Sequence, residues 1–377
     1  MSHAARLAWL LAATLSGCAG SGDGMTPPDG GQAIGDDGGS PSLPGFVAVK
    51  SGALVIDDQP FRMVGVNRYD VASFPPGSGK YACGNAYTDA QLDQLLSELV
   101  SSTGATVLRT WAFQSFTDGG SDWSSLDRVV AGAKRHGLKL IFTLENEWKD
   151  CTQPDSAAVD GHKSGAWYRD GYKQATGTYP LAYRDYVQAV VARYANEPTV
   201  ALWQLLNEAE SDDGPALLAF VKDVAALVKS IDRQHLLSLG TIGSGQAGTA
   251  GSAFRALHAV AQIDLVEAHD YHNETVALPG SPSSSENSVY ADLADAKALG
   301  KPFFVGEVGI AAPTPMYPFT VAERAKYMDA KLQALIGAGA VGVLVWSFYD
   351  LKPDNHEGWD FDGADPLAAV VKKYVAP

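Results

Sequence analysis

Two rhythms of apolar and polar positions alternate along this chain from Met63 onward. Short apolar runs of strand length are each followed by a longer stretch in which apolar residues return every three or four positions, which is typical of helices packed on a sheet. We expect strands at Met63–Val66, Ala105–Trp111, Leu138–Leu144, Val200–Leu206, Leu236–Leu239, Ile263–His269, Phe303–Val308 and Val341–Phe348. We expect helices at Asp89–Leu99, Ser124–Arg135, Tyr183–Tyr194, Pro215–Ser230, Ala253–Ala261, Tyr290–Leu299, Ala322–Ile336 and Pro366–Tyr374.

The order of these elements predicts the fold class. Strands that alternate with helices indicate a parallel sheet in an α/β protein. The first predicted strand is not followed by a Gly-x-Gly-x-x-Gly turn, so the pattern favours a closed (β/α)8 TIM barrel over a doubly wound nucleotide-binding fold. Before the barrel, Phe46–Phe61 predicts a short N-terminal β-hairpin with a turn at Asp57-Asp58 and a second break at Gly52.

The first 44 residues differ in composition from the rest of the chain. Residues 1–17 place Arg6 before a mostly apolar stretch, which is typical of a secretory signal. Leu15-Ser16-Gly17-Cys18 resembles the lipobox of bacterial lipoproteins, so we expect Cys18 to be lipidated; a plain secretory signal is the alternative. Residues 18–44 are rich in Gly, Asp, Ser and Pro and predict a flexible linker, which leaves residues 45–377 for the barrel.

These features predict an exported protein that is either lipid-anchored in the cell envelope or secreted. No later segment has enough uninterrupted apolar residues to span a bilayer, so we expect contact with a membrane only through the lipid. The formal net charge of −15 argues against a nucleic-acid partner, whereas a neutral polysaccharide suits an acidic, aromatic-bearing surface. We expect a monomer without a cofactor. We also expect no metal site, because no Cys/His cluster has zinc-ligand spacing.

Two further cysteines, Cys83 and Cys151, form an even pair once Cys18 carries lipid. In an exported protein such a pair predicts a disulfide, here between two long loops. These loops follow the first and third predicted strands, which are not neighbours in a barrel. Two unrelated thiols are therefore the alternative.

Two glutamates follow apolar runs in positions that suggest chemistry. Glu208 comes after the fourth predicted strand, and Glu307 lies at the end of the seventh. These two strands lie across the barrel mouth from one another, so both side chains can reach a substrate bound over its centre. Facing carboxylates cleave glycosidic bonds, with retention at a separation of about 5 to 5.5 Å and inversion at about 6.5 to 9.5 Å.

Five motifs carry a resemblance to a known family. Arg109-Thr110-Trp111-Ala112-Phe113, Asn207-Glu208, His269-Asp270-Tyr271, Gly306-Glu307-Val308-Gly309 and Trp346 resemble, in order and placement, glycoside hydrolase family 5 of the retaining 4/7 superfamily. The resemblance covers nearly all of 46–377, and the first motif is most similar to the β-mannanase branch. It implies retaining hydrolysis of a β-linked glycan, with Glu208 as general acid/base and Glu307 as nucleophile.

The same resemblance implies supporting roles for four neighbours. Arg109 ends an otherwise apolar strand, where an arginine is costly unless it is paired with an acid such as Glu307. Asn207 is placed to donate to the sugar 2-hydroxyl. His269 and Tyr271 are two residues apart in extended chain, so both can flank the nucleophile. The alternatives are a rim salt bridge for the arginine, a strand-ending turn for the asparagine and a structural role for the histidine.

Substrate contacts are predicted from aromatic residues near strand ends. Trp346 ends the eighth predicted strand and offers a flat surface for stacking a sugar, with barrel core as the alternative. Trp111 and Trp148 are further candidates, and Asn146 resembles part of an Asn-x-Trp found after the third strand of mannanases. Glu145 and Glu147 are rival acids, ranked lower because the resembled family has no catalytic carboxylate on that strand.

The residues after Glu208 leave the substrate open. Many family members continue with Pro, and mannanases often with Pro-Arg, whereas this chain continues with Ala209-Glu210. We predict an endo-β-1,4-mannanase that acts on a β-1,4-linked polysaccharide. An endo-β-1,4-glucanase or another β-glycosidase is the alternative within the family, and a non-catalytic glycan-binding surface lipoprotein is the alternative of another class.

Overall fold

The computed structural model describes residues 44–152, 158–159, 162–175, 179–271, 289–313, 318–349 and 358–376. The expected lipidation site, Cys18, lies outside the described residues, as does the whole loop at 272–287. Within the described part, no helix is both long and apolar enough to cross a membrane.

Eight parallel strands form the central sheet, and each neighbours the next in chain order. Backbone hydrogen bonds from Asp264 and Leu265 to Leu237 O, at 2.9 and 3.3 Å, join the first and last members of the hydrogen-bonded series. The predicted TIM barrel is therefore confirmed. Its strands are β4 (Met63–Asn67), β5 (Val107–Trp111), β6 (Lys139–Thr143), β9 (Val200–Gln204), β10 (Leu236–Ser238), β11 (Val266–Asp270), β12 (Phe303–Val308) and β13 (Gly342–Val345).

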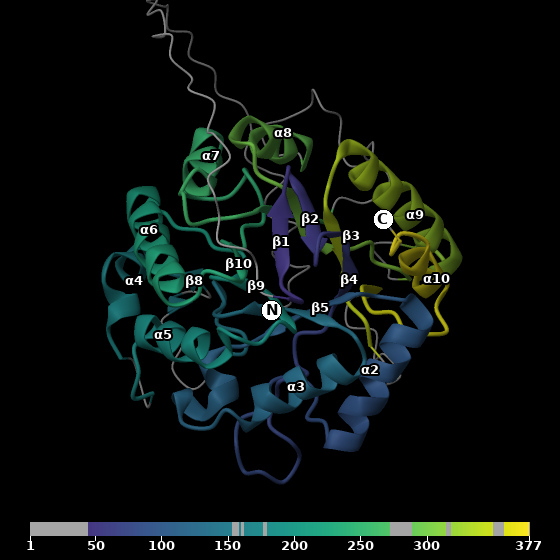
Figure 1. Cartoon of the computed structure of the whole chain (residues 1–377), viewed down its shortest axis with the longest axis horizontal. Helices are drawn as coiled ribbons and strands as arrows, with labels where there is room; N and C mark the ends of the chain where they lie inside the picture. The colour runs from purple at the N-terminus through teal and green to yellow at the C-terminus, as the bar shows by residue number, and fades with distance from the viewer. Residues whose placement is uncertain are drawn as a thin grey trace, which may run out of the picture. The chain divides into compact units, whose positions relative to one another are not determined.

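Helices surround these strands in the cartoon of Figure 1. Two of them, α2 and α9, begin with a capping box, at Thr88 with Gln91 and at Thr320 with Glu323, in which side chain and backbone satisfy each other's first-turn donors. The helices of the repeating units are α2 (Asp89–Thr103), α3 (Ser124–Arg135), α5 (Tyr183–Tyr194), α6 (Gly214–Ile231), α7 (Ser252–His258), α8 (Val289–Leu299), α9 (Val321–Ala338) and α10 (Pro366–Lys373).

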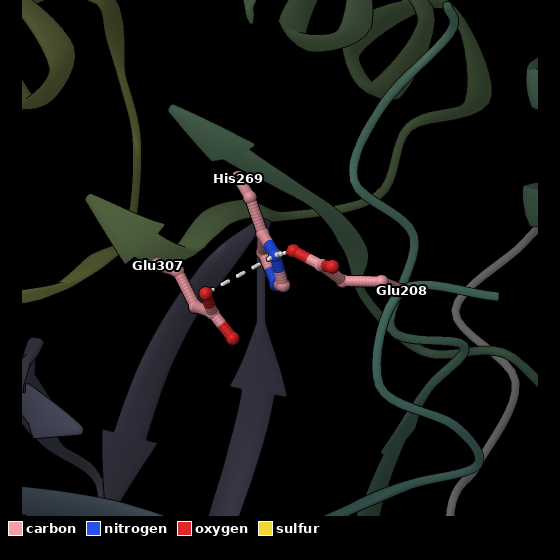
Figure 2. Close-up of side chains that lie close together, drawn as sticks. All are labelled: Glu208, His269 and Glu307. Carbon is pink, nitrogen blue, oxygen red and sulfur yellow. Dashed lines mark hydrogen bonds and ion pairs between the residues drawn. The ribbon is translucent and has the colours of Figure 1, made fainter. Parts of the chain in front are cut away.

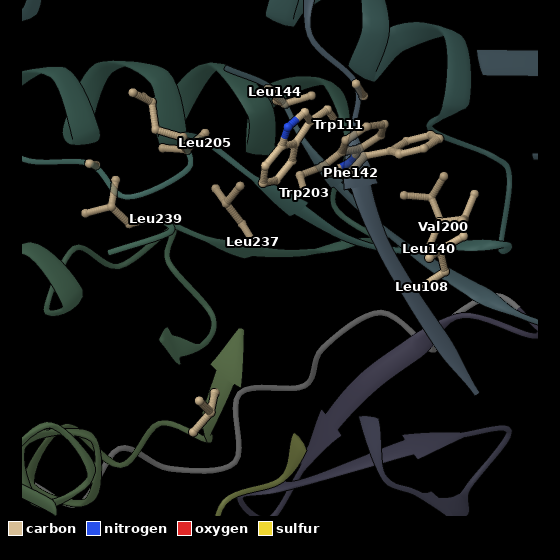
Figure 3. Packing of buried hydrophobic residues seen from close by; sticks show 14 of the residues in the cluster. Leu108, Trp111, Leu140, Phe142, Leu144, Val200, Trp203, Leu205, Leu237 and Leu239 are labelled. Carbon is tan, nitrogen blue, oxygen red and sulfur yellow. The ribbon is translucent and has the colours of Figure 1, made fainter. Parts of the chain in front are cut away.

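The main core lies between strands and helices. Trp203 and Phe142 point out of the sheet and pack at 6.0 Å between ring centroids, beside Leu108, Leu140 and Val200 (Figure 3). Since side chains alternate across a strand, the next residue along β9, Gln204, points into the barrel. Outward apolar residues thus hold the helices, which leaves inward positions near the strand ends for polar groups.

The predicted N-terminal hairpin is confirmed and is part of a small three-stranded antiparallel sheet of β1 (Val47–Lys50), β2 (Ala53–Ile56) and β3 (Gln59–Phe61). The chain reverses at both predicted breaks, at Ser51-Gly52 and at Asp57-Asp58, and all four residues have positive φ. Val47 and Leu54 pack against residues at the amino ends of the barrel strands. The small sheet therefore covers that end, and the opposite end remains for the site.

Further elements lie in the long loop after β6. They are the paired strands β7 (Ala158–Val159) and β8 (His162–Lys163), the helix α4 (Gly165–Arg169) and the short 3-10 helix η2 (Gly171–Lys173). Another 3-10 helix, η1 (Gln114–Gly120), follows β5. The expected disulfide joins Cys83 to Cys151, with 5.4 Å between Cα atoms. It links the loop after β4 with the loop after β6, although β5 separates these two strands. The two loops meet beside the loop that follows β5. Ser115 of that intervening loop donates to the Cys151 carbonyl.

Candidate active site

Glu208 and Glu307 converge at the carboxyl end of the barrel strands. In Figure 2 their side chains enter from opposite sides, and the ring of His269 lies between them. One carboxylate oxygen of each glutamate lies within 4.8 Å of the other. This separation is on the short side of the range for retaining glycosidases and well short of the gap that an inverting enzyme keeps for water.

The backbone at Glu208 is held from two sides. The Asn207 N–H donates to Glu145 O at 2.7 Å, and the Ala209 N–H donates to Gly240 O at 3.2 Å. Glu208 itself has a φ of 57°, a left-handed conformation that is uncommon for a residue with a side chain. The loops after β6 and β10 thus hold an unfavourable turn, which aims the carboxylate over the barrel mouth.

Glu307 lies in β12 and is almost fully buried with its partners. Arg109 Nη1 donates to Glu307 Oε1 at 2.6 Å, and the Tyr271 hydroxyl donates to Oε2. Burial and the nearby charge of Glu307 raise the pKa of Tyr271 well above its usual value, so the phenol stays a donor. Both contacts fix the orientation of the Glu307 carboxylate, as covalent catalysis by a carboxylate would require.

His269 links the two glutamates. Its Nδ1 lies 2.9 Å from Glu208 Oε1 and 3.6 Å from Glu307 Oε2. Burial would lower the pKa of His269, but the charge of Glu307 and the hydrogen bonds with Glu208 and Glu267 outweigh it and raise this pKa to about 9. A cationic imidazole therefore lies between two acidic groups at neutral pH.

The two glycines around Glu307 make room for this arrangement. A Cβ on Gly306 would lie 2.0 Å from Glu267 Oε1, and a Cβ on Gly309 would lie 2.7 Å from the Tyr271 ring. Larger residues at either position would displace Glu267 or Tyr271, which surround Glu307 and His269. This close approach is the physical reason for the Gly-Glu-x-Gly motif.

Comparison with known proteins agrees with this geometry. Residues 182–338 match a family described as GH family 5 beta-mannosidase-like. The chain is 26% identical to mannan endo-1,4-beta-mannosidase A of Emericella nidulans, over 81% of this chain and 83% of that one. It is 29% identical to mannan endo-1,4-beta-mannosidase 7 of Arabidopsis thaliana, over 85% and 82%.

The chain matches glycoside hydrolase family 5. The predicted family and enzyme class are confirmed. In fold it is also similar to the endo-1,4-beta-mannanase of Rhizomucor miehei, with a TM-score of 0.64, 20% identity and coverage of 88% of this chain and 98% of that one.

Arg109 is held by three amides as well as by Glu307. Gln204 Oε1 accepts from Arg109 Nε and Nη2 at 3.0 and 2.7 Å, while Asn67 Oδ1 and Asn207 Oδ1 each accept one further bond. The guanidinium fork is thus fully directed, which an exposed salt bridge at the rim would not require. Asn207 also donates to Asn146 Oδ1 at 3.0 Å, which fixes its amide.

Sequence reasoning missed several members of this buried network, among them Gln204 and Glu267. Gln204 donates to Glu267, and Ser238 Oγ donates to the other oxygen of Glu267 at 2.7 Å. Gln204 and Glu267 are both fully buried. A signal was present for Gln204, because it is a lone polar residue in an otherwise apolar run and a buried polar group needs partners.

The three predicted sugar-contacting tryptophans differ in their partners and exposure. Trp148 Nε1 donates to Glu208 Oε2 at 2.7 Å, so this indole positions the acid. Trp111 is 4% exposed, stacked on Phe113 and under Arg109, which leaves it little surface for a sugar. Trp346 keeps a partly exposed face and lies nearly parallel to Tyr69, with 6.1 Å between ring centroids. Trp346 is therefore the best placed of the three for stacking.

The rival acids after β6 serve the loop rather than the reaction centre. Glu147 accepts from the Tyr168 hydroxyl and from Lys163 N at 2.9 Å. Burial raises the pKa of Glu147 to about 8, despite the opposing effects of these partners. Glu145 accepts from Asn146 N and lies 3.6 Å from the Lys163 ammonium. Both carboxylates thus secure the chain around β8.

A metal ion at the centre would need Glu208, His269 and Glu307 as ligands, since their donor atoms lie within 4.8 Å of one another. The Arg109 cation lies 2.6 Å from Glu307 and would repel a metal there. These residues fit proton and glycosyl transfer better.

Proposed function

We propose that this chain is an endo-1,4-β-mannanase that hydrolyses β-mannan with retention of configuration. The observation that carries the reaction is the Glu208–His269–Glu307 cluster, in which Arg109 and Tyr271 hold one carboxylate and Trp148 holds the other. The relatives described as mannan endo-1,4-beta-mannosidases support the choice of substrate, because their similarity extends over more than four fifths of the chain.

The reaction follows from the roles of the two carboxylates. Glu307 attacks the anomeric carbon while protonated Glu208 donates its proton to the glycosidic oxygen, so that the leaving glycan departs as an alcohol and a glycosyl ester forms on Glu307. Glu208 then takes a proton from water, which attacks the same carbon and releases Glu307. Asn207 Nδ2 carries a second proton besides the one it donates to Asn146, and this proton can bond the sugar 2-hydroxyl.

A panel of mannan, glucomannan, carboxymethyl cellulose and xylan, with product sizes recorded, tests the proposal. We expect rapid formation of mixed short oligosaccharides from mannan and glucomannan. Preference for carboxymethyl cellulose would instead support the endoglucanase alternative. The Glu307→Ala variant is the control, and hydrolysis of mannan by that variant at the wild-type rate would contradict the catalytic assignment.

We also propose that the protein is exported and attached to the cell envelope through lipid on Cys18. The support is the lipobox-like Leu15-Ser16-Gly17-Cys18 followed by the Gly/Asp/Ser/Pro-rich linker. Fractionation of cells that produce the wild type and the Cys18→Ala variant tests this. Membrane association should be lost in the variant, and retention there would contradict lipid attachment.

A further inference from the structure

A pocket of about 310 Å³, formed mainly by residues with polar or charged side chains, lies beside the chain that follows Glu208. One wall is the chain after Glu208, from Glu210 to Asp212, and the facing wall is His162 to Ser164, at and after β8. Glu147 also contributes to the lining. The volume is at the lower end of the range for small-molecule sites, which is adequate for one sugar unit and too small for a folded partner.

Two connections join this pocket to the general acid. Glu210 follows Glu208 by two residues, and Trp148, which donates to Glu208, packs on the His162 ring with 4.5 Å between centroids. The acid protonates the oxygen of the departing sugar, so that sugar must lie against Glu208. A glycan leaving the cleavage point on this side therefore passes the pocket.

The lining residues differ in the contacts that they make within the protein. Glu147 is used by Tyr168 and Lys163, and Lys163 donates to Asn146 O at 2.6 Å. Glu210 instead lies 3.1 Å from His162 Nδ1, with 17% of its side chain exposed, while His162 is 42% exposed. His162 is exposed and Glu210 is only partly buried, so hydroxyl groups of a bound sugar can reach this pair. Burial and the charge of Glu208 raise the pKa of Glu210 to about 7.

We propose that this pocket binds a neutral hexose unit of the leaving glycan, that Glu210 accepts hydrogen bonds from its hydroxyl groups, and that the same carboxylate disfavours acidic sugars. The proposal rests on the proposed mannanase function. It assigns a role to the residue at which this chain departs from the Pro-Arg of many mannanases. An arginine there would attract acidic sugars, and a glutamate repels them.

The first test compares two substrates that differ on the leaving side. The leaving group of an aryl β-mannobioside is a phenol, so this substrate places no sugar in the pocket. Mannohexaose has sugar units on the leaving side and can fill it. At pH 8, the ratio of kcat/KM for mannohexaose to kcat/KM for the aryl substrate should fall about 10-fold in Glu210→Ala, because one charge-assisted hydrogen bond is lost. Asp185→Asn removes an exposed acid on α5 and should keep the wild-type ratio. An unchanged ratio in Glu210→Ala would overturn the proposal.

The second test measures binding to the inactive Glu307→Ala protein by calorimetry, with neutral mannooligosaccharides of three to six units and the same compounds oxidised to aldonic acids at the reducing end. For at least one oligosaccharide length, the aldonic acid should bind about 10-fold more weakly than the neutral compound. Adding Glu210→Gln to the inactive protein should remove most of this difference in affinity. Equal discrimination with and without Glu210→Gln would overturn the selection against acidic sugars. A wild-type protein that cleaves neither mannohexaose nor the aryl substrate would instead overturn the mannanase function itself.

Discussion

The imidazole Nδ1 of His269 lies 2.9 Å from Glu208 Oε1. The same nitrogen lies 3.6 Å from Glu307, so one ring connects the proton donor with the nucleophile. Cleavage of a glycosidic bond requires two carboxylates of unequal protonation only a few ångströms apart, and their mutual repulsion must be offset. His269 and Arg109 supply that compensation in the interior of the barrel, where water screens little.

The raised pKa of His269 predicts a stability contribution that depends on pH. The folded value of about 9 exceeds the ordinary 6.5, so the contribution is fully present below pH 6.5 and is lost as pH rises through 9. The difference in unfolding free energy between wild type and His269→Asn should therefore shrink between pH 6 and pH 10, by roughly 3 kcal/mol. Urea denaturation at several pH values measures it, and a difference independent of pH would contradict the cationic ring.

Replacement of Glu208 should affect substrates according to their leaving groups. In Glu208→Ala the rate on mannan should fall by about 10²- to 10⁴-fold, because the glycosidic oxygen is no longer protonated. A dinitrophenyl β-mannobioside needs no such proton, so a burst of phenolate should still appear as the ester on Glu307 forms. Glu307→Ala should give no burst. Equal losses of Glu208→Ala on both substrates would argue against its role as the acid.

Gln204 should influence the reaction through Arg109 and Glu267. In Gln204→Ala the guanidinium loses the acceptor at Nε and Nη2. We expect kcat on mannan to fall about 10- to 100-fold with a smaller change in KM, since the nucleophile is misoriented while the outer cleft remains. Gln188→Ala, on the exposed face of α5, is the matched control. A change confined to KM would indicate a role in substrate binding instead.

The close approach at Gly306 predicts opposite effects for two Gly→Ala substitutions. Gly306→Ala places a Cβ 2.0 Å from Glu267 Oε1 and should destabilise the protein by about 1–3 kcal/mol, with loss of activity. Gly337→Ala, in α9, meets nothing within 4 Å and should stabilise it by about 0.5–1 kcal/mol. Thermal unfolding compares the two, and equal shifts of Tm would contradict the packing at Gly306.

Loss of the Cys83–Cys151 disulfide should lower stability. The bond closes a loop with a sequence separation of 68, and its removal should cost about 4 kcal/mol through the greater entropy of the unfolded chain. Unfolding of the wild type is compared with that of the Cys83→Ser/Cys151→Ser double variant. A reductant should lower the wild-type Tm toward that of the double variant and leave the double variant unchanged. If reduction left the wild-type Tm unchanged, the bond would have no such effect.

Much of the fold could be predicted from local pattern alone. Side-chain periodicity depends on neighbours a few residues apart, so the eight strands and their helices were recognisable, and their order implied the barrel. Glu208 and Glu307 were recognisable for the same reason, since the ends of parallel strands share one rim. Gly52 and Asp57-Asp58 likewise indicated the two N-terminal turns, whereas the pairing of β1, β2 and β3 into one sheet is a tertiary feature.

The sequence by itself therefore determined the barrel and the positions of the two carboxylates along it. Tertiary structure decided which groups touch them or lie near them: Trp148 holds Glu208, Gln204 bonds Glu267 in the buried network, and Glu210 pairs with His162 in the wall of the pocket. The physical reason is range. Periodicity acts within an element, whereas a hydrogen bond between residues 60 or more positions apart, such as that of Trp148 with Glu208, depends on how loops and strands pack together.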